Sequence, residues 1–247
     1  MALRRGARSV LRALTGHGAG AGGLRRRRLG QAALLRQLAD SDADKLADAL
    51  TNLDSLDTSR IEEARARLEQ DPTALPAPFK KGTVGEMAAS SSSPRHKGLL
   101  LHALVAEWAP GRVLEMGTCC GVSGAYIGSA RPGSFTSLEF SPILADTARR
   151  LWLELGVAGE VRVGDFADTF AAALEPAPDL VFVDGNHAEG PTWDYFEKLA
   201  KVCPPGALLV FDDIGWSDGM RSVWTRIQDD PRARVTADVG TCGLVIL

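Results

Sequence analysis

The sequence predicts an α/β protein built on a doubly wound parallel sheet, preceded by a helical extension. A short apolar run at residues 113–116 breaks into Gly117, Gly121 and Gly124, which lets the backbone turn sharply and approach a ligand. Beyond it, strand-like runs alternate with helical stretches, as in a parallel sheet covered on both faces. A chain of 247 residues, 45% hydrophobic and 24% charged, is long enough for one such domain and an extension.

The N-terminal segment is strongly basic. Residues 1–39 hold nine arginines and no acidic residue, which leaves 19 of the 28 basic residues against all 31 acidic ones. A glycine- and alanine-rich run at residues 16–23 favours a linker, so we expect a basic flexible tail over residues 1–30. A mitochondrial transit peptide and a membrane-surface or nucleic-acid arm are the alternatives for such an arginine-rich start. Cytoplasmic localisation is otherwise expected, because the sequence shows neither a membrane span nor a secretion signal.

Residues 31–95 are predicted to form the helical extension. Leucines recur at helical spacing over residues 31–69, and Ser59 opens an S-R-I-E pattern typical of a capping box. Residues 80–94 are expected to be a loop because glycines and a serine run interrupt the pattern. A helix over residues 97–109 then leads into the α/β domain, predicted at residues 96–247.

The elements of the α/β domain follow from local signals. Ser141 followed by Pro142 predicts the cap and first turn of a helix that reaches residue 155, and Pro191 opens another. A further helix is expected over residues 217–228. The predicted strands are 113–116, 134–139, 160–163, 180–184 and 207–212.

The turn after the first strand is predicted to bind a nucleotide-type cofactor. Gly117 and Gly121 are separated by Thr118 and two cysteines, so the turn lacks the G-x-G of dinucleotide folds. A helix beginning near Gly121 directs free N–H groups to the space above the strand. Glu115 suits an ammonium or sulfonium group, while Ser123 and the helix N–H groups suit a carboxylate.

In these residues the chain resembles the first motif of class I S-adenosylmethionine-dependent methyltransferases. The segment E-M-G-T-C-C-G-V-S is most similar to the catechol O-methyltransferase branch, and D-G-N-H with F-D-D-I-G-W-S is similar to a bacterial group of these enzymes. The resemblance covers about residues 97–247. It implies a Rossmann-like, seven-stranded, mostly parallel sheet with a closing antiparallel hairpin at residues 234–239 and 243–247. It also implies S-adenosylmethionine as the cofactor, with the N-terminal helices as a cap over it.

Three further residues are predicted to hold the cofactor. Glu139 lies 22 residues after Gly117, an offset at which an acidic residue commonly accepts hydrogen bonds from both ribose hydroxyls. By the resemblance, Asp165 accepts from the exocyclic amine of adenine and Phe166 lies against the ring. The alternatives are a solvated Glu139 and an Asp165 that only caps the helix beginning at Phe166.

Acidic residues also end two neighbouring predicted strands. Asp184 ends one, and Asp212 with Asp213 ends the next. Adjacent strand ends lie about 5 Å apart, so the three carboxylates are expected to converge, which requires a cation or protonation. Hard oxygen ligands suit Mg²⁺ or Mn²⁺ better than zinc. In catechol-type O-methyltransferases the matching positions are metal ligands, and many members carry Asn where Asp213 stands.

His187 is the predicted catalytic base. It follows Asp184 by three residues, where the catechol enzyme has a lysine and some sugar O-methyltransferases have a histidine base. The resemblance therefore implies that His187 and Asp184 form the catalytic group, because a histidine titrating near neutrality can take a hydroxyl proton. The alternative is a loop histidine that packs on Trp193 or Trp216.

Four cysteines, Cys119, Cys120, Cys203 and Cys242, show no C-x-x-C spacing, so reduced thiols are expected. Cys119 and Cys120 lie in the glycine turn. Their expected role is small-residue packing beside the cofactor, with a redox-active vicinal pair as the alternative.

The predicted function is S-adenosylmethionine-dependent, divalent-metal-dependent O-methylation of a small-molecule hydroxyl. The alternatives are a metal-independent small-molecule methyltransferase, an NAD-type Rossmann oxidoreductase and a noncatalytic cofactor-binding module. An acidic body without a basic groove predicts no nucleic-acid partner. No stable membrane insertion is expected, and a homodimer is compatible with the sequence.

Overall fold

The computed structural model describes residues 21–53, 56–79 and 82–247, and the side chains of residues 21–27 lie outside that description. The chain divides into two compact units. We call Leu53–Glu175 the central unit. The terminal unit comprises the described residues up to Asn52 together with Pro176–Leu247.

The strands form one mixed sheet with the order β3-β2-β1-β4-β5-β7-β6. Pairing is parallel for β1 with β2, β2 with β3 and β4 with β5, whereas β7 pairs antiparallel with both β5 and β6. The predicted Rossmann-like sheet of seven strands with a closing antiparallel hairpin is therefore confirmed. The strands are β1 (Val113–Met116), β2 (Phe135–Glu139), β3 (Glu160–Val163), β4 (Leu180–Val183), β5 (Leu208–Phe211), β6 (Val235–Val239) and β7 (Cys242–Ile246).

The central unit contains β1, β2, β3 and the helices α4 (Ser59–Leu68), α5 (Val84–Ser91), α6 (Arg95–Trp108), α7 (Val122–Ser129), α8 (Pro142–Leu155) and α9 (Phe166–Ala173). The start of α8 is as predicted: the Ser141 side chain accepts a hydrogen bond from the backbone N–H of Leu144, and Pro142 occupies the first turn. Gly156 ends this helix with a φ of 72°, in the left-handed region that glycine favours.

Two local predictions in the central unit were wrong. The predicted loop at residues 80–94 contains α5, because Thr83 caps that helix: Thr83 Oγ1 accepts from the Glu86 N–H, and the Glu86 side chain accepts from the N–H of Gly82, just before the cap. Ser59 does not cap α4. It is the first residue of the helix, and its N–H and hydroxyl both donate to Asp57.

The terminal unit contains α2 (Ala21–Leu35), a 3₁₀ turn at Arg36–Leu38, α3 (Ser41–Thr51), α10 (Glu189–Val202) and α11 (Asp218–Asp229) with β4 to β7. Helix α2 starts at Ala21, inside the predicted tail, because the stretch is rich in arginine, leucine and alanine, which favour helix. Residues 1–20 of that tail lie outside the described residues. The remaining predicted domain limits stay predictions.

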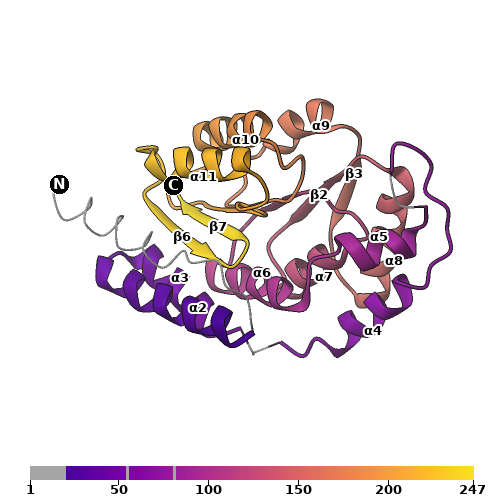
Figure 1. The fold of residues 1–247 in the computed structure, drawn as a ribbon, viewed down its shortest axis with the longest axis horizontal. Coiled ribbons are helices and arrows are strands. Elements are labelled where there is room, and N and C mark those ends of the chain that lie inside the picture. Colours follow the sequence, from indigo (N-terminus) through magenta and orange to yellow (C-terminus); the bar gives the residue numbers. More distant parts are fainter. Residues whose placement is uncertain (1–20, 54–55, 80–81) are drawn as a thin grey trace. The chain divides into compact units, whose positions relative to one another are not determined.

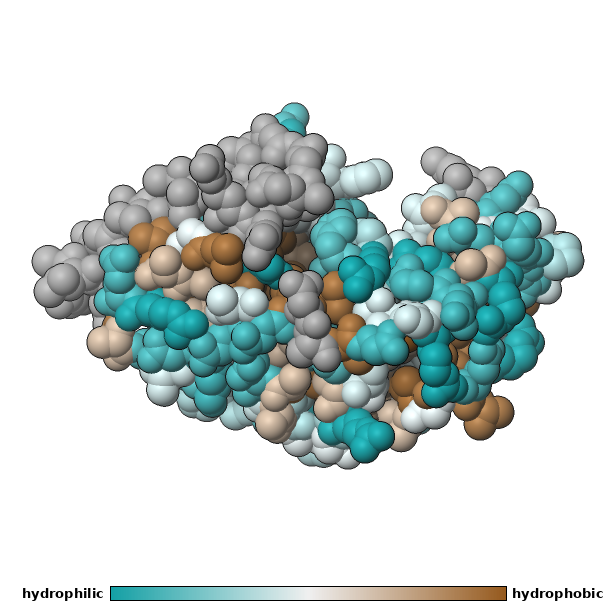
Figure 2. Space-filling view, turned by 90° about the horizontal axis from the view of Figure 1, so that it is seen from below, coloured by the Kyte–Doolittle hydropathy of each residue, from teal (hydrophilic) through white to brown (hydrophobic). Residues whose placement is uncertain are grey.

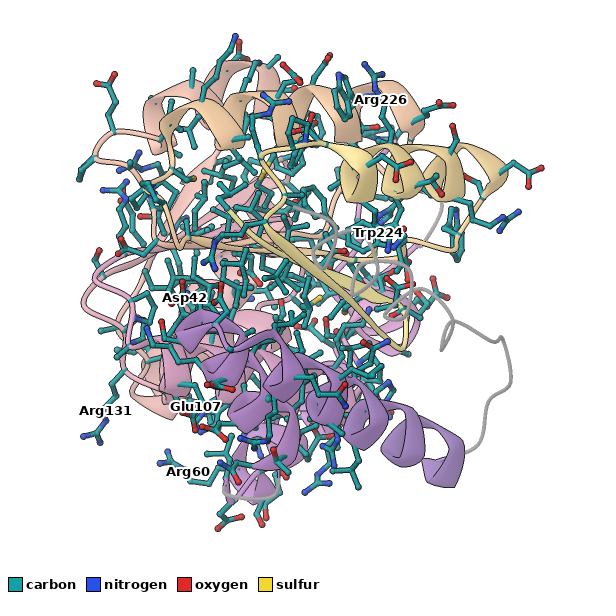
Figure 3. The ribbon with its side chains drawn as sticks, turned by 90° about the vertical axis from the view of Figure 1, so that its left-hand side faces the viewer. Asp42, Arg60, Glu107, Arg131, Trp224 and Arg226 are labelled. Carbon is teal, nitrogen blue, oxygen red and sulfur yellow. The ribbon has the colours of Figure 1, made fainter. Side chains whose placement is uncertain are left out.

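The β6–β7 hairpin lies between the α2–α3 pair and the α10–α11 pair (Figure 1). Arg234 of β6's N-terminal flank forms ion pairs with Asp40 and Asp42, which cap and open α3. On the other side, Trp224 of α11 faces the hairpin (Figure 3), where a Cβ on Gly243 would lie 2.6 Å from the indole. The hairpin is thus fixed on both sides.

Within residues 21–53, 56–79 and 82–247, none of the helices combines the length and apolar character needed to cross a membrane. On the face shown in Figure 2, hydrophilic residues predominate and hydrophobic residues form separate patches.

Candidate functional site

The turn between β1 and α7, residues 117–121, is held by backbone contacts within the central unit. We call it the cofactor turn. The N–H groups of Gly117 and Thr118 both donate to the carbonyl of Leu138 in β2, at 3.0 and 3.2 Å. The φ angles of Gly117, Cys119 and Gly121 are 101°, 48° and 86°. Three left-handed residues in one short turn fix its path tightly, and only two of them are glycine.

At Gly121 and Gly124 a side chain is excluded by neighbouring residues of the protein and not by a ligand. A Cβ on Gly121 would lie 2.7 Å from the Cβ of Ala148, and a Cβ on Gly124 would lie 2.2 Å from the ring of Trp152. The Trp152 indole also donates a 2.8 Å hydrogen bond to the Gly121 carbonyl. The expectation that Gly124 leaves room for a ligand is therefore corrected, because that room is filled by Trp152 of α8.

Buried polar side chains of β1, β2 and the cofactor turn are linked by hydrogen bonds. Glu115 is fully buried in β1 and accepts a 2.6 Å hydrogen bond from Ser137, whose hydroxyl lies 2.5 Å from that of Thr118. A buried carboxylate needs donors or a cation to offset its desolvation. Ser123, in the first turn of α7, is 5% exposed. The predicted ammonium and carboxylate contacts of these residues stay predictions.

Glu139 is held in one orientation at the end of β2. Its two carboxylate oxygens accept 2.8 Å hydrogen bonds from the backbone N–H groups of Cys119 and Ser141. Burial raises the pKa of Glu139, although the N–H groups of Ser141, Cys119 and Phe140 oppose the increase. Glu139, the residue predicted to bind the ribose, is therefore fixed beside the cofactor turn in the central unit.

The predicted adenine residues lie at the start of α9. Asp165 is exposed and accepts a 2.8 Å hydrogen bond from the Ala167 N–H, so it caps the helix as the alternative expected. This hydrogen bond uses only the Oδ1 atom of Asp165. Phe166 is half-buried. Phe140, which the sequence analysis did not single out, is 52% exposed and follows Glu139 directly.

The second group of predicted residues lies in the terminal unit. Residues 184–188 follow β4 and residues 212–217 follow β5, and we call these two segments the acidic loops. Val183 is paired with Phe211, and the Asp212 N–H donates to the Val183 carbonyl at 2.9 Å. Asp184 and Asp212 therefore leave the sheet at the same level, as predicted for the carboxyl ends of neighbouring parallel strands.

His187 pairs with Asp184. Their Nε2 and Oδ1 atoms are 3.4 Å apart, and the two side chains are 26% and 20% exposed. The hydrogen bond that His187 donates to Asp184 raises the pKa of His187, burial opposes this, and the charges of Asp184, Asp213 and Asp212 add to the increase. The acidic loops therefore produce a negative field that favours a positive charge at His187.

The carboxylates are held by separate partners. Asp212 is 3% exposed, and its Oδ1 accepts from the Thr241 hydroxyl at 3.3 Å and the Cys242 thiol at 3.5 Å. Asp184 instead faces His187. Among the residues that the structure describes, no three His, Cys, Asp or Glu side chains are grouped so that they could hold a metal ion. Metal binding by Asp184, Asp212 and Asp213 stays a prediction.

Several supporting residues were missed by the sequence analysis. The amide of Asn186 donates to the Tyr195 hydroxyl at 3.5 Å, which ties the first acidic loop to α10. Asn186 and Asp213 both have a positive φ, 52° and 50°, and strained residues of this kind cluster at functional sites. Trp216 is 72% exposed on the second acidic loop. Asn186 and Asp213 lie in the D-G-N-H and D-D-I-G-W patterns, and Asn and Asp adopt a positive φ more readily than most residues.

The central unit defines a class of protein. A parallel sheet whose first strand ends in a tight left-handed turn, with an acidic side chain fixed at the end of the second strand, is the arrangement of cofactor-binding α/β enzymes. Residues 114–214 match the family described as "Methyltransferase domain". The recognition of a class I S-adenosylmethionine-dependent methyltransferase domain is therefore confirmed for this part of the chain.

Individual proteins agree with this assignment. The O-methyltransferase imqG of Aspergillus flavus is 31% identical over 114 residues, which cover 41% of this chain and 44% of that protein. The chain therefore aligns with less than half of the length of this curated relative.

Solved structures show the same fold. An O-methyltransferase from Bacillus cereus in complex with SAH has a TM-score of 0.58 at 21% identity, covering 78% of this chain and 93% of that one. The SAH-bound methyltransferase PaMTH1 of Podospora anserina has a TM-score of 0.62 at 18% identity, covering 83% and 94%.

Proposed function

We propose that this protein transfers the methyl group of S-adenosylmethionine to a hydroxyl oxygen of a small molecule. The observation that carries the proposal is the fixed carboxylate of Glu139 beside the cofactor turn. The match of residues 114–214 to a methyltransferase family supports it, as does the similarity to an Aspergillus flavus O-methyltransferase.

The central unit would hold the cofactor. Glu139 accepts the two ribose hydroxyls, because both of its oxygens keep a free lone pair after accepting from the backbone. Phe140 offers an exposed ring for adenine next to Phe166, and the second oxygen of Asp165 accepts from the exocyclic amine. The amino-acid end is assigned to the buried side chains of Glu115, Thr118 and Ser123 and to the backbone from Gly117 to Gly121 that leads into the N-terminus of α7.

In the terminal unit, His187 would act as the base. Its imidazole takes the proton of the acceptor hydroxyl while that oxygen bonds to the methyl carbon, and the electron pair of the broken sulfur–carbon bond stays on sulfur. Asp184 stabilises the imidazolium that forms. Because the neutral imidazole is required, the rate is expected to rise as the pH passes the raised pKa of His187. Orientation of the reacting atoms supplies most of the acceleration.

Dependence on Mg²⁺ or Mn²⁺ is the second part of this proposal. Three carboxylates in two neighbouring loops, with a field that raises the pKa of His187, favour a cation chemically. The contacts of Asp212 with Thr241 and of Asp184 with His187 favour the metal-independent alternative, because they occupy the carboxylates separately. No step of the reaction is therefore assigned to a metal.

Calorimetry with S-adenosylhomocysteine tests cofactor binding, and turnover measurements test methyl transfer, the role of a metal and the role of His187. The purified protein should bind S-adenosylhomocysteine with micromolar affinity and not bind NADH. A methyl-transfer screen over phenols and vicinal diols, run with EDTA, with Mg²⁺ and with Mn²⁺, should give a methylated product. His187→Ala should lower kcat with little change in cofactor affinity. Absence of S-adenosylhomocysteine binding would contradict the proposal, and equal turnover in EDTA would remove the metal from it.

A further inference from the structure

Two adjacent thiols lie in the cofactor turn. The Sγ atoms of Cys119 and Cys120 are 3.9 Å apart, and both residues are free cysteines. Cys119 is half-buried, whereas Cys120 is fully buried. Cys119 is thus the more accessible residue of the pair, and the Cys120 sulfur is close enough to reach its sulfur.

The backbone of this pair is part of the proposed cofactor site. Cys119 has a φ of 48°, and its N–H donates to the Glu139 carboxylate at 2.8 Å. The Cys120 thiol lies 3.9 Å from the Val84 carbonyl and packs in a cluster with residues of α5 and α8. Drawing the two sulfur atoms together therefore moves Cys120 out of its packing site and turns the Cys119 N–H relative to Glu139.

We propose that hydrogen peroxide converts Cys119 and Cys120 into a reversible vicinal disulfide, and that this disulfide weakens binding of the cofactor. The effect on cofactor binding rests on the proposed function, because it assumes that the turn holds S-adenosylmethionine. Formation of the disulfide concerns only the two thiols.

The chemistry balances with peroxide as the oxidant. The Cys119 sulfur takes one peroxide oxygen to become a sulfenic acid and releases water. The Cys120 sulfur then attacks the Cys119 sulfur and releases a second water, which leaves the disulfide. Neighbouring Cα atoms are about 3.8 Å apart, closer than in ordinary disulfides, so the product is strained and readily reduced. The Cys120 hydrogen bond and burial raise the pKa of the Cys119 thiol, so the oxidation is slow at neutral pH.

Peptide mass spectrometry tests the disulfide without any cofactor. Trypsin cleaves after Arg112 and Arg149 but not before Pro132, so residues 113–149 form one peptide whose only cysteines are this pair. After peroxide treatment and alkylation of free thiols, the peptide should carry no alkyl groups and weigh two hydrogens less than the reduced form. Dithiothreitol should restore both alkylation sites. Unchanged thiols, or stable oxygen adducts on Cys119, would overturn the disulfide.

Calorimetry on the same samples tests the coupling. Peroxide should lower the affinity for S-adenosylhomocysteine at least tenfold, and dithiothreitol should restore it. Cys203→Ser keeps the pair and should behave as wild type, whereas Cys119→Ser should show the same affinity before and after peroxide. Disulfide formation with unchanged affinity, or an equal loss in Cys119→Ser, would overturn the coupling. If the untreated protein binds no S-adenosylhomocysteine, the proposed function fails instead, and the mass shift still decides the disulfide.

Discussion

The carboxylate beside the cofactor turn accepts from backbone N–H groups, whereas the carboxylates of Asp184 and Asp212 in the acidic loops contact side chains. In the turn, Glu139 accepts from two backbone N–H groups, and Trp152 fills the space beside Gly121 and Gly124. In the acidic loops, the contacts of Asp184 and Asp212 run through side chains. Glu139 is therefore oriented by the backbone itself, whereas the orientation of Asp184 and Asp212 depends on neighbouring side chains that a substitution can change.

The largest effect is expected from adding one methyl group to the packing of the turn. In Gly124→Ala the new Cβ would lie 2.2 Å from Trp152, which α7 and α8 cannot accommodate without moving apart. The free energy of unfolding should fall by about 2–3 kcal/mol, and S-adenosylhomocysteine binding should weaken. Urea denaturation and calorimetry measure both.

The matched control is Gly190→Ala in α10, where a Cβ would meet no heavy atom within 4 Å. This variant should be as stable as wild type or slightly more stable, because alanine favours helix over glycine by up to about 1 kcal/mol. Equal stability of the Gly124 and Gly190 variants would show that Trp152 does not explain the glycine motif.

Glu139→Gln is expected to have the next largest effect. An amide has one acceptor oxygen, so one of the N–H groups of Cys119 and Ser141 loses its partner, and the charged hydrogen bonds to ribose are lost as well. The Kd for S-adenosylhomocysteine should rise about 10- to 100-fold. Glu160→Gln at the start of β3 removes a carboxylate that pairs with Arg162 and should leave the Kd unchanged. A small effect of Glu139→Gln would place the ribose elsewhere.

The same comparison explains what the sequence could predict. Strand ends, the helix opened by Ser141-Pro142 and the turn at Gly117 depend on backbone conformation, which proline, glycine and apolar runs report directly. Thr83, which caps α5, is the same kind of local signal. The separate partners of Asp184 and Asp212 were not predictable, because the Thr241 contact comes from a hairpin about thirty residues away in the chain, where only tertiary packing decides the side-chain direction.

Asp184→Asn tests whether the acidic loops control the charge of His187. Loss of the negative partner should lower the pKa of His187 toward its ordinary value, as followed by NMR of the imidazole in EDTA. Because the folded-state pKa is raised in wild type, the pair contributes stability below the ordinary histidine pKa and loses it as the pH rises through the folded value. Wild type should therefore exceed the variant by about 0.5–1 kcal/mol at acidic pH, with no difference at alkaline pH. An unchanged His187 titration would contradict this.

The smallest effect is expected where the acidic loops meet the β6–β7 hairpin. Thr241→Val removes the hydroxyl that donates to Asp212 at 3.3 Å, while Thr241→Ser keeps it. Because Thr241 is exposed, water replaces the lost donor, and the valine variant should lose only about 0.5 kcal/mol in urea denaturation. The carboxylate then has one donor fewer, while the Cys242 thiol still contacts it, so Mg²⁺ should bind Thr241→Val at least as tightly as wild type in calorimetry. Weaker binding would mean that Thr241 orients Asp212 toward the ion instead of holding it away.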